Sequence, residues 1–180
     1  MRCKPVQWMG ILVLIVIFGG CASATKTNVD SQVAVQESLQ QLIDQQEILE
    51  LISRYSYSWD SKQPDKLAAI FTDDASWEWW PPGAQKAKVI HTPRKTFRDW
   101  AAERFRTNLA DRQTRHYQTN TVFLAMTNNM ARTRTIILVT HSVHGEKGPK
   151  IPAHSGTYED EFRKTPDGWR ISRRILRTDG

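Results

Sequence analysis

A histidine stands at the start of a segment with the pattern of a β-strand, where its imidazole could act as a base. The stretch RHYQTN, residues 115–120, precedes an apolar run at 122–126. Side chains of a strand point alternately to its two faces. One face would therefore carry five residues: His116, Gln118, Asn120, Val122 and Leu124. This face could line a cavity that is polar at one end and apolar at the other. The alternative is a solvated strand end.

An aspartate at the end of a predicted helix is a second candidate. Asp60 follows an apolar helical stripe that includes Ile48, Ile52, Tyr55 and Trp59. A carboxylate at a helix C-terminus opposes the helix dipole at a cost of about 0.3–1 kcal/mol, so stability alone would favour a lysine there. An aspartate can instead fix the tautomer of a histidine and stabilise its protonated form. The alternative is an exposed carboxylate before a turn.

Arginines crowd the last predicted strand, residues 168–178. Alternation places Arg170 and Arg174 on the same face, which is typical of a solvated surface. Alternatively, Arg174 could bind an anion and stabilise a leaving group or an enolate oxygen. Asn120, on the predicted face of His116, could orient a substrate or could simply bond to the sheet edge.

Three tryptophans lie close to these candidates. Trp59 precedes Asp60, while Trp77 and Trp79 share one face of a predicted strand at 75–80. Packing in the core is the usual role of a tryptophan side chain. The alternative is an aromatic wall that holds a flat, apolar ligand in a cavity. The sequence leaves both open.

The sequence predicts neither a metal site nor a cofactor. His141 and His144 are three residues apart on a predicted strand and so face opposite sides, while His91 and His154 have no nearby companions. The two cysteines lie outside the expected folded domain, which excludes disulfides, thiolate nucleophiles and Cys-ligated metals from it.

The N-terminus resembles the signal of a bacterial lipoprotein. Two basic residues precede an apolar stretch, residues 8–18, that is shorter than the ~20 residues needed to cross a bilayer. The stretch ends in Phe18-Gly19-Gly20-Cys21, similar to the motif in which the cysteine after the cleavage site is lipidated. We therefore expect three parts: a signal peptide at 1–20, a tether at 21–31 that begins with a lipidated Cys21 carrying acyl chains such as palmitate, and a folded domain at 32–180. This implies attachment to a membrane of the bacterial cell envelope; the alternative is an uncleaved membrane anchor.

The charge of the mature chain does not suggest a nucleic-acid partner. Removing the signal takes away Arg2 and Lys4 and lowers the net charge from +6 to +4. The remaining basic residues are spread along the chain and do not cluster on one helix or arm.

Helical patterns come first in the folded domain, and strand patterns follow. Apolar residues at three- and four-residue spacing predict a helix up to about residue 59, and Pro64 and Pro93 mark the starts of two more helices. Strands are predicted at 75–80, 115–126, 130–144, 153–164 and 168–178. This order indicates the α+β class, with about three N-terminal helices on one face of an antiparallel sheet.

Three stretches resemble the SnoaL-like branch of the nuclear transport factor 2 (NTF2-like) superfamily. They are EILELISRYSYSWDSKQPDKLAAIFTDDASWEW at 47–79, RHYQTNTVF at 115–123 and GTYEDEFRKTPDGWRISRRILRTD at 156–179. The resemblance implies a cone, in which a strongly curved antiparallel sheet is closed at one end by helices around an internal pocket. Scytalone dehydratase and hexachlorocyclohexane dehydrochlorinase are the enzymes of this superfamily that the motifs resemble.

The resemblance assigns roles to four residues. The family's catalytic aspartate ends the first long helix, as Asp60 does in SWDSKQ, and its general-base histidine lies in an HYxTN strand, as His116 does. A catalytic arginine five residues after the tryptophan of the last strand corresponds to Arg174. The residue five before the helix-end aspartate lines the family's site, and here it is Tyr55.

Two functions follow from this resemblance. The first is a lyase, dehydratase or isomerase that needs no cofactor and acts on a small hydrophobic or aromatic molecule. The second is a protein that binds a ligand or a partner in the same cone without catalysis. Related cones often dimerise through the outer face of the sheet, so a homo-oligomer is an expectation from the family alone.

Overall fold

The computed structural model describes residues 21–145, 147 and 151–180. The chain divides into two units, Met1–Gln40 and Gln41–Gly180. The predicted signal peptide lies outside the described residues. The predicted tether at 21–31 is helical, because helix α1 runs from Cys21 to Asp60. No helix within the described ranges is long and apolar enough to cross a membrane.

The C-terminal part of α1 contributes to the core of the second unit. Its buried residues recur every three or four positions: Asp44, Ile48, Leu51, Ile52, Tyr55, Ser58 and Trp59. The stripe predicted from the apolar pattern is therefore confirmed. The sequence at 44–47 resembles a helix start, but the helix passes straight through it. The buried Asp44 carboxylate accepts a hydrogen bond from Lys164 Nζ at 2.7 Å and so does not act as a cap.

Two short helices follow, and both begin as their prolines predict. Helix α2 runs from Pro64 to Ala69, with proline in its first turn, and α3 runs from Arg94 to Arg106 after Pro93. Proline is tolerated there because the first turn of a helix has no internal partner for its N–H groups. Phe97, Ala101 and Phe105 form the buried face of α3.

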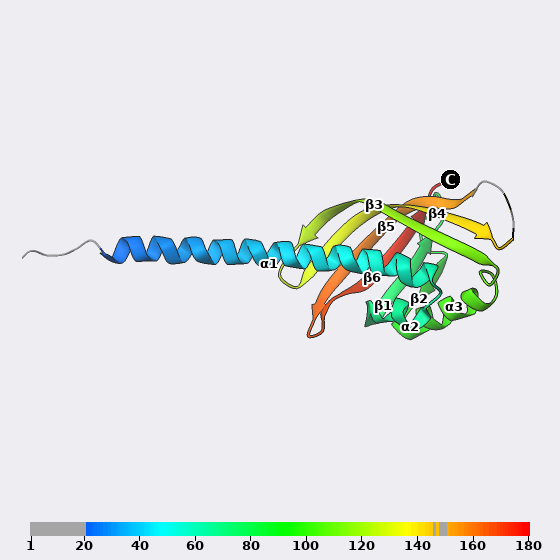
Figure 1. Ribbon diagram of the computed structural model, residues 1–180, viewed down its shortest axis with the longest axis horizontal. Helices are drawn as coiled ribbons and strands as arrows, with labels where there is room; N and C mark the ends of the chain where they lie inside the picture. The colour runs from blue at the N-terminus through cyan, green and yellow to red at the C-terminus, as the bar shows by residue number, and fades with distance from the viewer. Residues whose placement is uncertain (1–20, 146, 148–150) are drawn as a thin grey trace, which may run out of the picture. The chain divides into compact units, whose positions relative to one another are not determined.

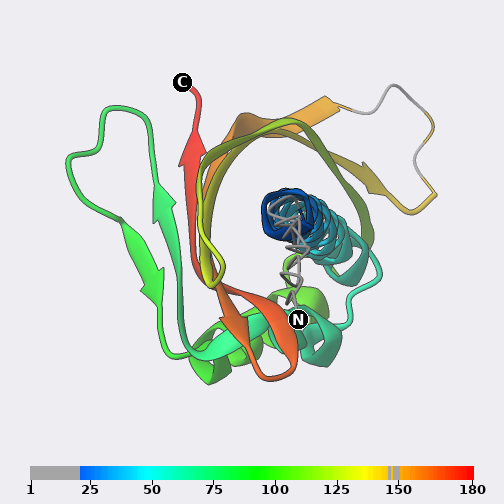
Figure 2. The same ribbon diagram turned by 90° about the vertical axis from the view of Figure 1, so that its left-hand side faces the viewer.

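Six strands form one sheet that curves strongly into an open arc, as Figures 1 and 2 show. They are β1 (Phe71–Trp80), β2 (Val89–His91), β3 (Arg112–Met126), β4 (Met130–Val143), β5 (Ile151–Thr165) and β6 (Gly168–Thr178). Their order is β2-β1-β6-β5-β4-β3. The predicted α+β cone is confirmed, with one correction. The sheet is mixed, because β1 and β6 pair in parallel.

A β-bulge in β3 changes which side chains face inward. Between the pairs Thr119↔Ile136 and Val122↔Arg134, β3 has one residue more than β4. Asn120 takes a positive φ of 53° at this bulge, and Thr121 and Phe123 then point inward. Alternation wrongly predicted that Val122 and Leu124 share the inner face with His116; both are exposed, because the extra residue reverses the alternation.

A second bulge lies in β6 at Ser172. Phe162 pairs with Ile171, but the next residue toward the N-terminus of β5, Glu161, pairs with Arg173. The extra residue turns Arg174 toward the interior, where its side chain is fully buried, while Arg170 stays partly exposed. The prediction that Arg170 and Arg174 share a face was therefore wrong.

Candidate functional site

The end of α1 and the start of β3 meet at Asp60 and His116. Asp60 Oδ1 lies 2.6 Å from His116 Nδ1, and Oδ2 accepts a hydrogen bond from the His116 backbone N–H at 3.0 Å. Thr114 Oγ1 donates to Oδ1 at 2.8 Å. Gln113 Nε2 donates to the main-chain oxygen of Asp60 at 3.0 Å, which satisfies one of the free carbonyls of the helix end. These contacts explain why an aspartate stands where the helix dipole disfavours it.

The hydrogen bond to Asp60 assigns the tautomer of His116. A carboxylate only accepts hydrogen bonds, so Nδ1 carries the proton in the neutral ring. Nε2 is then the nitrogen with a free lone pair. Both side chains are largely buried, yet His116 lines an internal cavity. Nε2 is therefore the atom of this ring that can take a proton from a ligand.

The cavity has a volume of about 690 Å³ and an aromatic wall. Tyr55, Trp59, Trp77 and Trp79, all expected from the sequence, line it together with His116. Trp59 and Tyr55 also pack against the imidazole, with ring centroids 5.7 and 6.3 Å from it. A cavity of this size and lining suits a small aromatic molecule.

A charged layer lies behind the cavity. Arg174 and Asp160 form a two-pronged ion pair, with both N–O distances at 2.7 Å and both side chains 0% exposed. The Arg174 guanidinium lies between the rings of Tyr55 and Tyr158, 4.0 and 4.2 Å from their centroids. Arg174 does not line the cavity, so the structure does not bring this predicted anion binder to a ligand directly.

The two tyrosines separate that layer from the cavity, which both of them line. Burial raises the pKa of the Tyr55 hydroxyl, against the opposing effects of the Arg174 charge and of hydrogen bonds from Tyr158 and Trp77. Trp77 Nε1 donates to the Tyr55 oxygen at 3.2 Å. Tyr55 therefore remains protonated at neutral pH and can donate its O–H to a ligand. Tyr158, which has the same burial, was not predicted from the sequence.

Asn120 is the other predicted residue that the structure does not bring to the cavity. It sits at the bulge of β3, where its side chain is exposed and accepts a hydrogen bond from Thr119 Oγ1. The bulge that gives Asn120 its positive φ also removes it from the face of His116. Asparagine tolerates this left-handed conformation better than most residues, which is the sequence signal for the bulge.

Sequence reasoning missed a basic end of the cavity. Arg104, Arg112, His141 and His154 line it, and they come from α3, β3, β4 and β5. Burial, with smaller contributions from the charges of His116, His141 and Arg104, lowers the pKa of His154 to about 4. Burial and the charge of Arg112 also lower the pKa of His141. The expectation that His154 has no companions was wrong, because the pairing of β4 with β5 brings it to His141.

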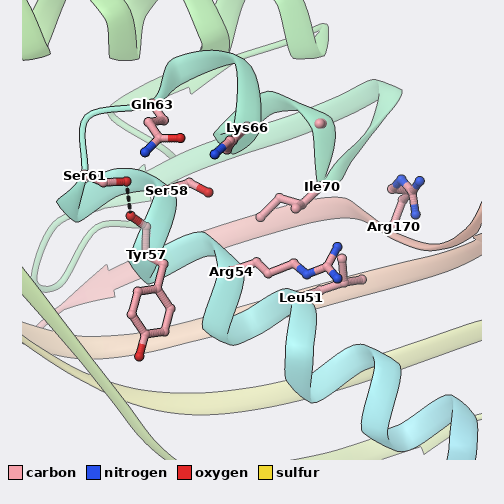
Figure 3. Close-up of a pocket in the computed structure, with 10 residues that line it drawn as sticks. Leu51, Arg54, Tyr57, Ser58, Ser61, Gln63, Lys66, Ile70 and Arg170 are labelled. Atoms are coloured by element: carbon pink, nitrogen blue, oxygen red, sulfur yellow. Dashed lines mark hydrogen bonds between the residues drawn. The ribbon is translucent and has the colours of Figure 1, made fainter.

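A second hollow, of about 590 Å³, lies on the outer side of α1 and α2. Figure 3 shows the side chains of Arg54, Tyr57, Lys66 and Arg170 around it. Arg54 is paired with Glu50 on the same helix, and Arg170 donates to the backbone oxygen of Trp169. None of the predicted site residues lines this outer groove.

Comparison with known proteins agrees with this fold. The SnoaL-like domain family matches residues 40–175 of the chain. Among solved structures, an NTF2-like protein with a cystatin-like fold from Novosphingobium aromaticivorans is 23% identical, with a TM-score of 0.68 over 80% of this chain and 87% of that chain. A proposed scytalone dehydratase from the same species is 25% identical, with a TM-score of 0.66 over 79% and 89%. A variant of Rv3472, a protein of unknown function from Mycobacterium tuberculosis, is 25% identical, with a TM-score of 0.65 over 77% and 73%. No curated protein sequence matches the chain.

Proposed function

The chain belongs to the SnoaL-like family, and we propose that it is a lyase, dehydratase or isomerase that needs no cofactor and uses His116 as a general base. One observation carries the proposal: the 2.6 Å contact of Asp60 with His116 Nδ1, beside an aromatic cavity that His116 itself lines. A base needs an orienting group on one nitrogen and access to substrate on the other, and this arrangement supplies both.

The reaction would begin with proton abstraction from carbon. His116 Nε2 takes a proton from a carbon next to an electron-withdrawing group, and the C–H electrons form a new C=C bond. In an elimination, halide leaves the neighbouring carbon with its bonding electrons, or a hydroxyl group leaves with them and takes the proton from the His116 imidazolium to form water. In an isomerisation, the proton returns to a different carbon. In both cases the Asp60 carboxylate stabilises the imidazolium that forms when His116 takes the proton.

The other cavity residues have supporting roles in this proposal. The Tyr55 hydroxyl would donate a hydrogen bond to the oxygen of an enolate, which carries negative charge only after proton abstraction. Arg174 would act as a positioning residue, because it contacts the rings of Tyr55 and Tyr158 rather than the cavity. The tryptophan wall would hold the substrate ring.

Hydrogen exchange on carbon tests the base without knowledge of the leaving group. A panel of aromatic ketones, including 2-tetralone, is incubated with the protein in D₂O, and loss of the α-proton signal is followed by NMR. The wild type should accelerate exchange, and His116→Gln should slow it by about 10²–10⁴-fold. Asp60→Asn should slow it as well, and the double variant should be little slower than His116→Gln, because both residues serve one step.

Two outcomes would contradict the proposal. Additive losses in Asp60→Asn and His116→Gln would mean that the residues act independently. Saturable binding of ketones without any exchange would favour the alternative function, a ligand-binding protein with the same cavity. The exposed His144 supplies the control, because His144→Gln changes a histidine outside the cavity and should leave exchange unchanged.

We also propose that the chain is a lipoprotein of the bacterial cell envelope, anchored through Cys21. The support is the sequence from residue 2 to 21, in which two basic residues and a short apolar stretch precede Gly19-Gly20-Cys21. Stable anchoring requires two or more acyl chains, because one chain binds a bilayer only marginally. Metabolic labelling with an alkyne fatty acid should label the wild type and not Cys21→Ala, which should leave the membrane fraction. Equal labelling of both would exclude the anchor.

A further inference from the structure

Arg104 is a cation that lines the cavity without a carboxylate partner. It comes from α3, and its side chain is partly buried, with Nε fully shielded from solvent. Nε has no hydrogen-bond acceptor, and no ion pair to Arg104 is found within the described part of the chain. Its contact is with the ring of Trp100, whose centroid lies 5.2 Å from the guanidinium carbon.

The fully buried arginine of the sheet is neutralised, because Arg174 is paired with Asp160. Even Arg173, whose side chain is 39% exposed, binds the buried Glu78 at 2.7 Å. A buried cation without a counter-charge costs free energy, because it loses water and gains no partner. The same loss of water lowers the pKa of Arg104, because burial disfavours its charged form. A ligand that brings a negative charge to Arg104 would remove this cost.

The surroundings of Arg104 are basic as well. Arg112, His141 and His154 line the same end of the cavity, and the charge of Arg104 contributes to the lowered pKa of both histidines. Among the lining residues described, Asp179 is a carboxylate, and its Oδ2 already accepts a hydrogen bond from Ser155 at 2.7 Å. The potential at this end of the cavity therefore favours an anion.

We propose that Arg104 is a specificity-determining residue that binds the carboxylate of a planar aromatic acid. The proposal rests on the proposed function and names its substrate class. A guanidinium binds a carboxylate through two parallel hydrogen bonds, and the two terminal Nη groups of Arg104, at the end of a side chain that lines the cavity, can supply both. The aromatic ring would lie against Trp100 and the neighbouring tryptophans. The acid would thereby be oriented in the cavity that His116 lines.

A matched pair of ligands tests the charge. Binding of 2-naphthoate and of its neutral analogue 2-naphthamide is measured by calorimetry, because the two differ mainly in the carboxylate. The wild type should bind the acid more tightly than the amide by about tenfold or more, as expected when a buried charge gains its partner. Arg104→Gln should lose this preference and keep the affinity for the amide. Arg104→Lys retains the positive charge but not the planar guanidinium, so it should keep part of the preference for the acid.

Arg106 supplies the control, because it lies two residues further along α3 and is exposed. Arg106→Gln should bind both ligands as the wild type does. Equal affinities of the wild type for acid and amide, or an undiminished preference in Arg104→Gln, would overturn the proposal, as would failure of both ligands to bind. Because binding is measured without turnover, His116→Gln should keep the preference for the acid. The two proposals can fail separately. If the wild type shows no preference for the acid but still catalyses His116-dependent exchange on ketones, this inference is refuted and the proposed function stands.

Discussion

The interior cavity and the outer groove are similar in volume but differ in how their charges are held. The cavity gathers side chains from α1, α3 and five strands, and His116, His141, His154 and Arg104 are at least partly buried in it, whereas Arg112 and Asp179 are exposed. The outer groove is lined mainly from α1 and α2, and its cations face solvent. Water and salt screen charges at a surface, whereas burial strengthens their interactions and shifts their pKa values. Position, more than residue type, therefore decides which hollow can do chemistry.

Two ion pairs, one in the layer behind the cavity and one beside the outer groove, illustrate this effect of burial. The side chains of Arg174 and Asp160 are 0% exposed, whereas those of Arg54 and Glu50 are 60% and 53% exposed. An exposed pair separated by four residues on a helix contributes about 0.3–0.5 kcal/mol. Removing one member of a buried pair leaves an uncompensated charge in the interior, which is far more costly.

The largest expected effect is loss of the buried pair. Asp160→Asn should lower the free energy of unfolding by about 3–5 kcal/mol, because Arg174 stays buried without its counter-charge. Glu50→Gln, the matched change at the outer groove, should lower it by less than about 0.5 kcal/mol. Urea unfolding of both variants measures the two values. Equal losses would mean that burial does not distinguish the pairs.

The second effect concerns pH. Burial, together with the charges of His116, His141 and Arg104, lowers the pKa of His154 from 6.5 to about 4, so the unfolded chain binds this proton more readily than the folded protein between these two values. Stability should therefore fall as the pH decreases from 6.5 to about 4, by about 1–2 kcal/mol from this residue, because water screens part of the interaction at a partly exposed side chain. Unfolding of His154→Asn across that range should show a correspondingly smaller loss. His144→Asn, at an exposed position, should show the same dependence of the free energy of unfolding on pH as the wild type. If His154→Asn also showed the wild-type dependence, His154 would not be the residue responsible for the loss.

The fold was largely predictable because several local signals agree. Three- and four-residue apolar spacing, the two prolines before short helices and turn residues between long strands gave the element order and the α+β class. The three-residue strand β2 was missed, since so short a segment has no periodicity to detect. The bulges at Asn120 in β3 and at Ser172 in β6 were missed for another reason. Alternation assumes a regular ladder, and Ser172 carries no feature that marks an extra residue.

The candidate site was predictable only in part. Motif resemblance identified Asp60, His116 and Tyr55, and the structure brings these three together around one cavity. The basic end was not predictable, because Arg104 and His154 are unremarkable on their own segments. Only the curvature of the sheet and the position of α3 bring them to the same space. Long-range convergence of this kind leaves no local trace in a sequence.

A smaller effect is expected at the wall of the cavity. Trp77→Phe removes the indole N–H that donates to the Tyr55 oxygen, and it should lower the free energy of unfolding by about 1 kcal/mol for that hydrogen bond. Trp80→Phe is the control on the same strand, because its N–H donates to Glu78 and its ring does not line the cavity. If exchange on aromatic ketones depends on Tyr55, it should slow in Trp77→Phe and not in Trp80→Phe. The same rate in all three proteins would show that this hydrogen bond does not tune the site.

The smallest effect should come from the outer groove. Lys66 is exposed and lines that groove, as Figure 3 shows, so Lys66→Gln removes a positive charge that water already screens. The free energy of unfolding should change by less than about 0.5 kcal/mol, which is typical of surface substitutions. The preference for 2-naphthoate over 2-naphthamide should also remain, because the acid is expected to bind at Arg104. Calorimetry measures the affinities of Lys66→Gln and Arg104→Gln for the two ligands, and so compares the loss of one positive charge in the outer groove with the loss of one in the cavity. A reduced preference in Lys66→Gln, equal to that in Arg104→Gln, would mean that the net charge of the protein and not the interior site selects the anion.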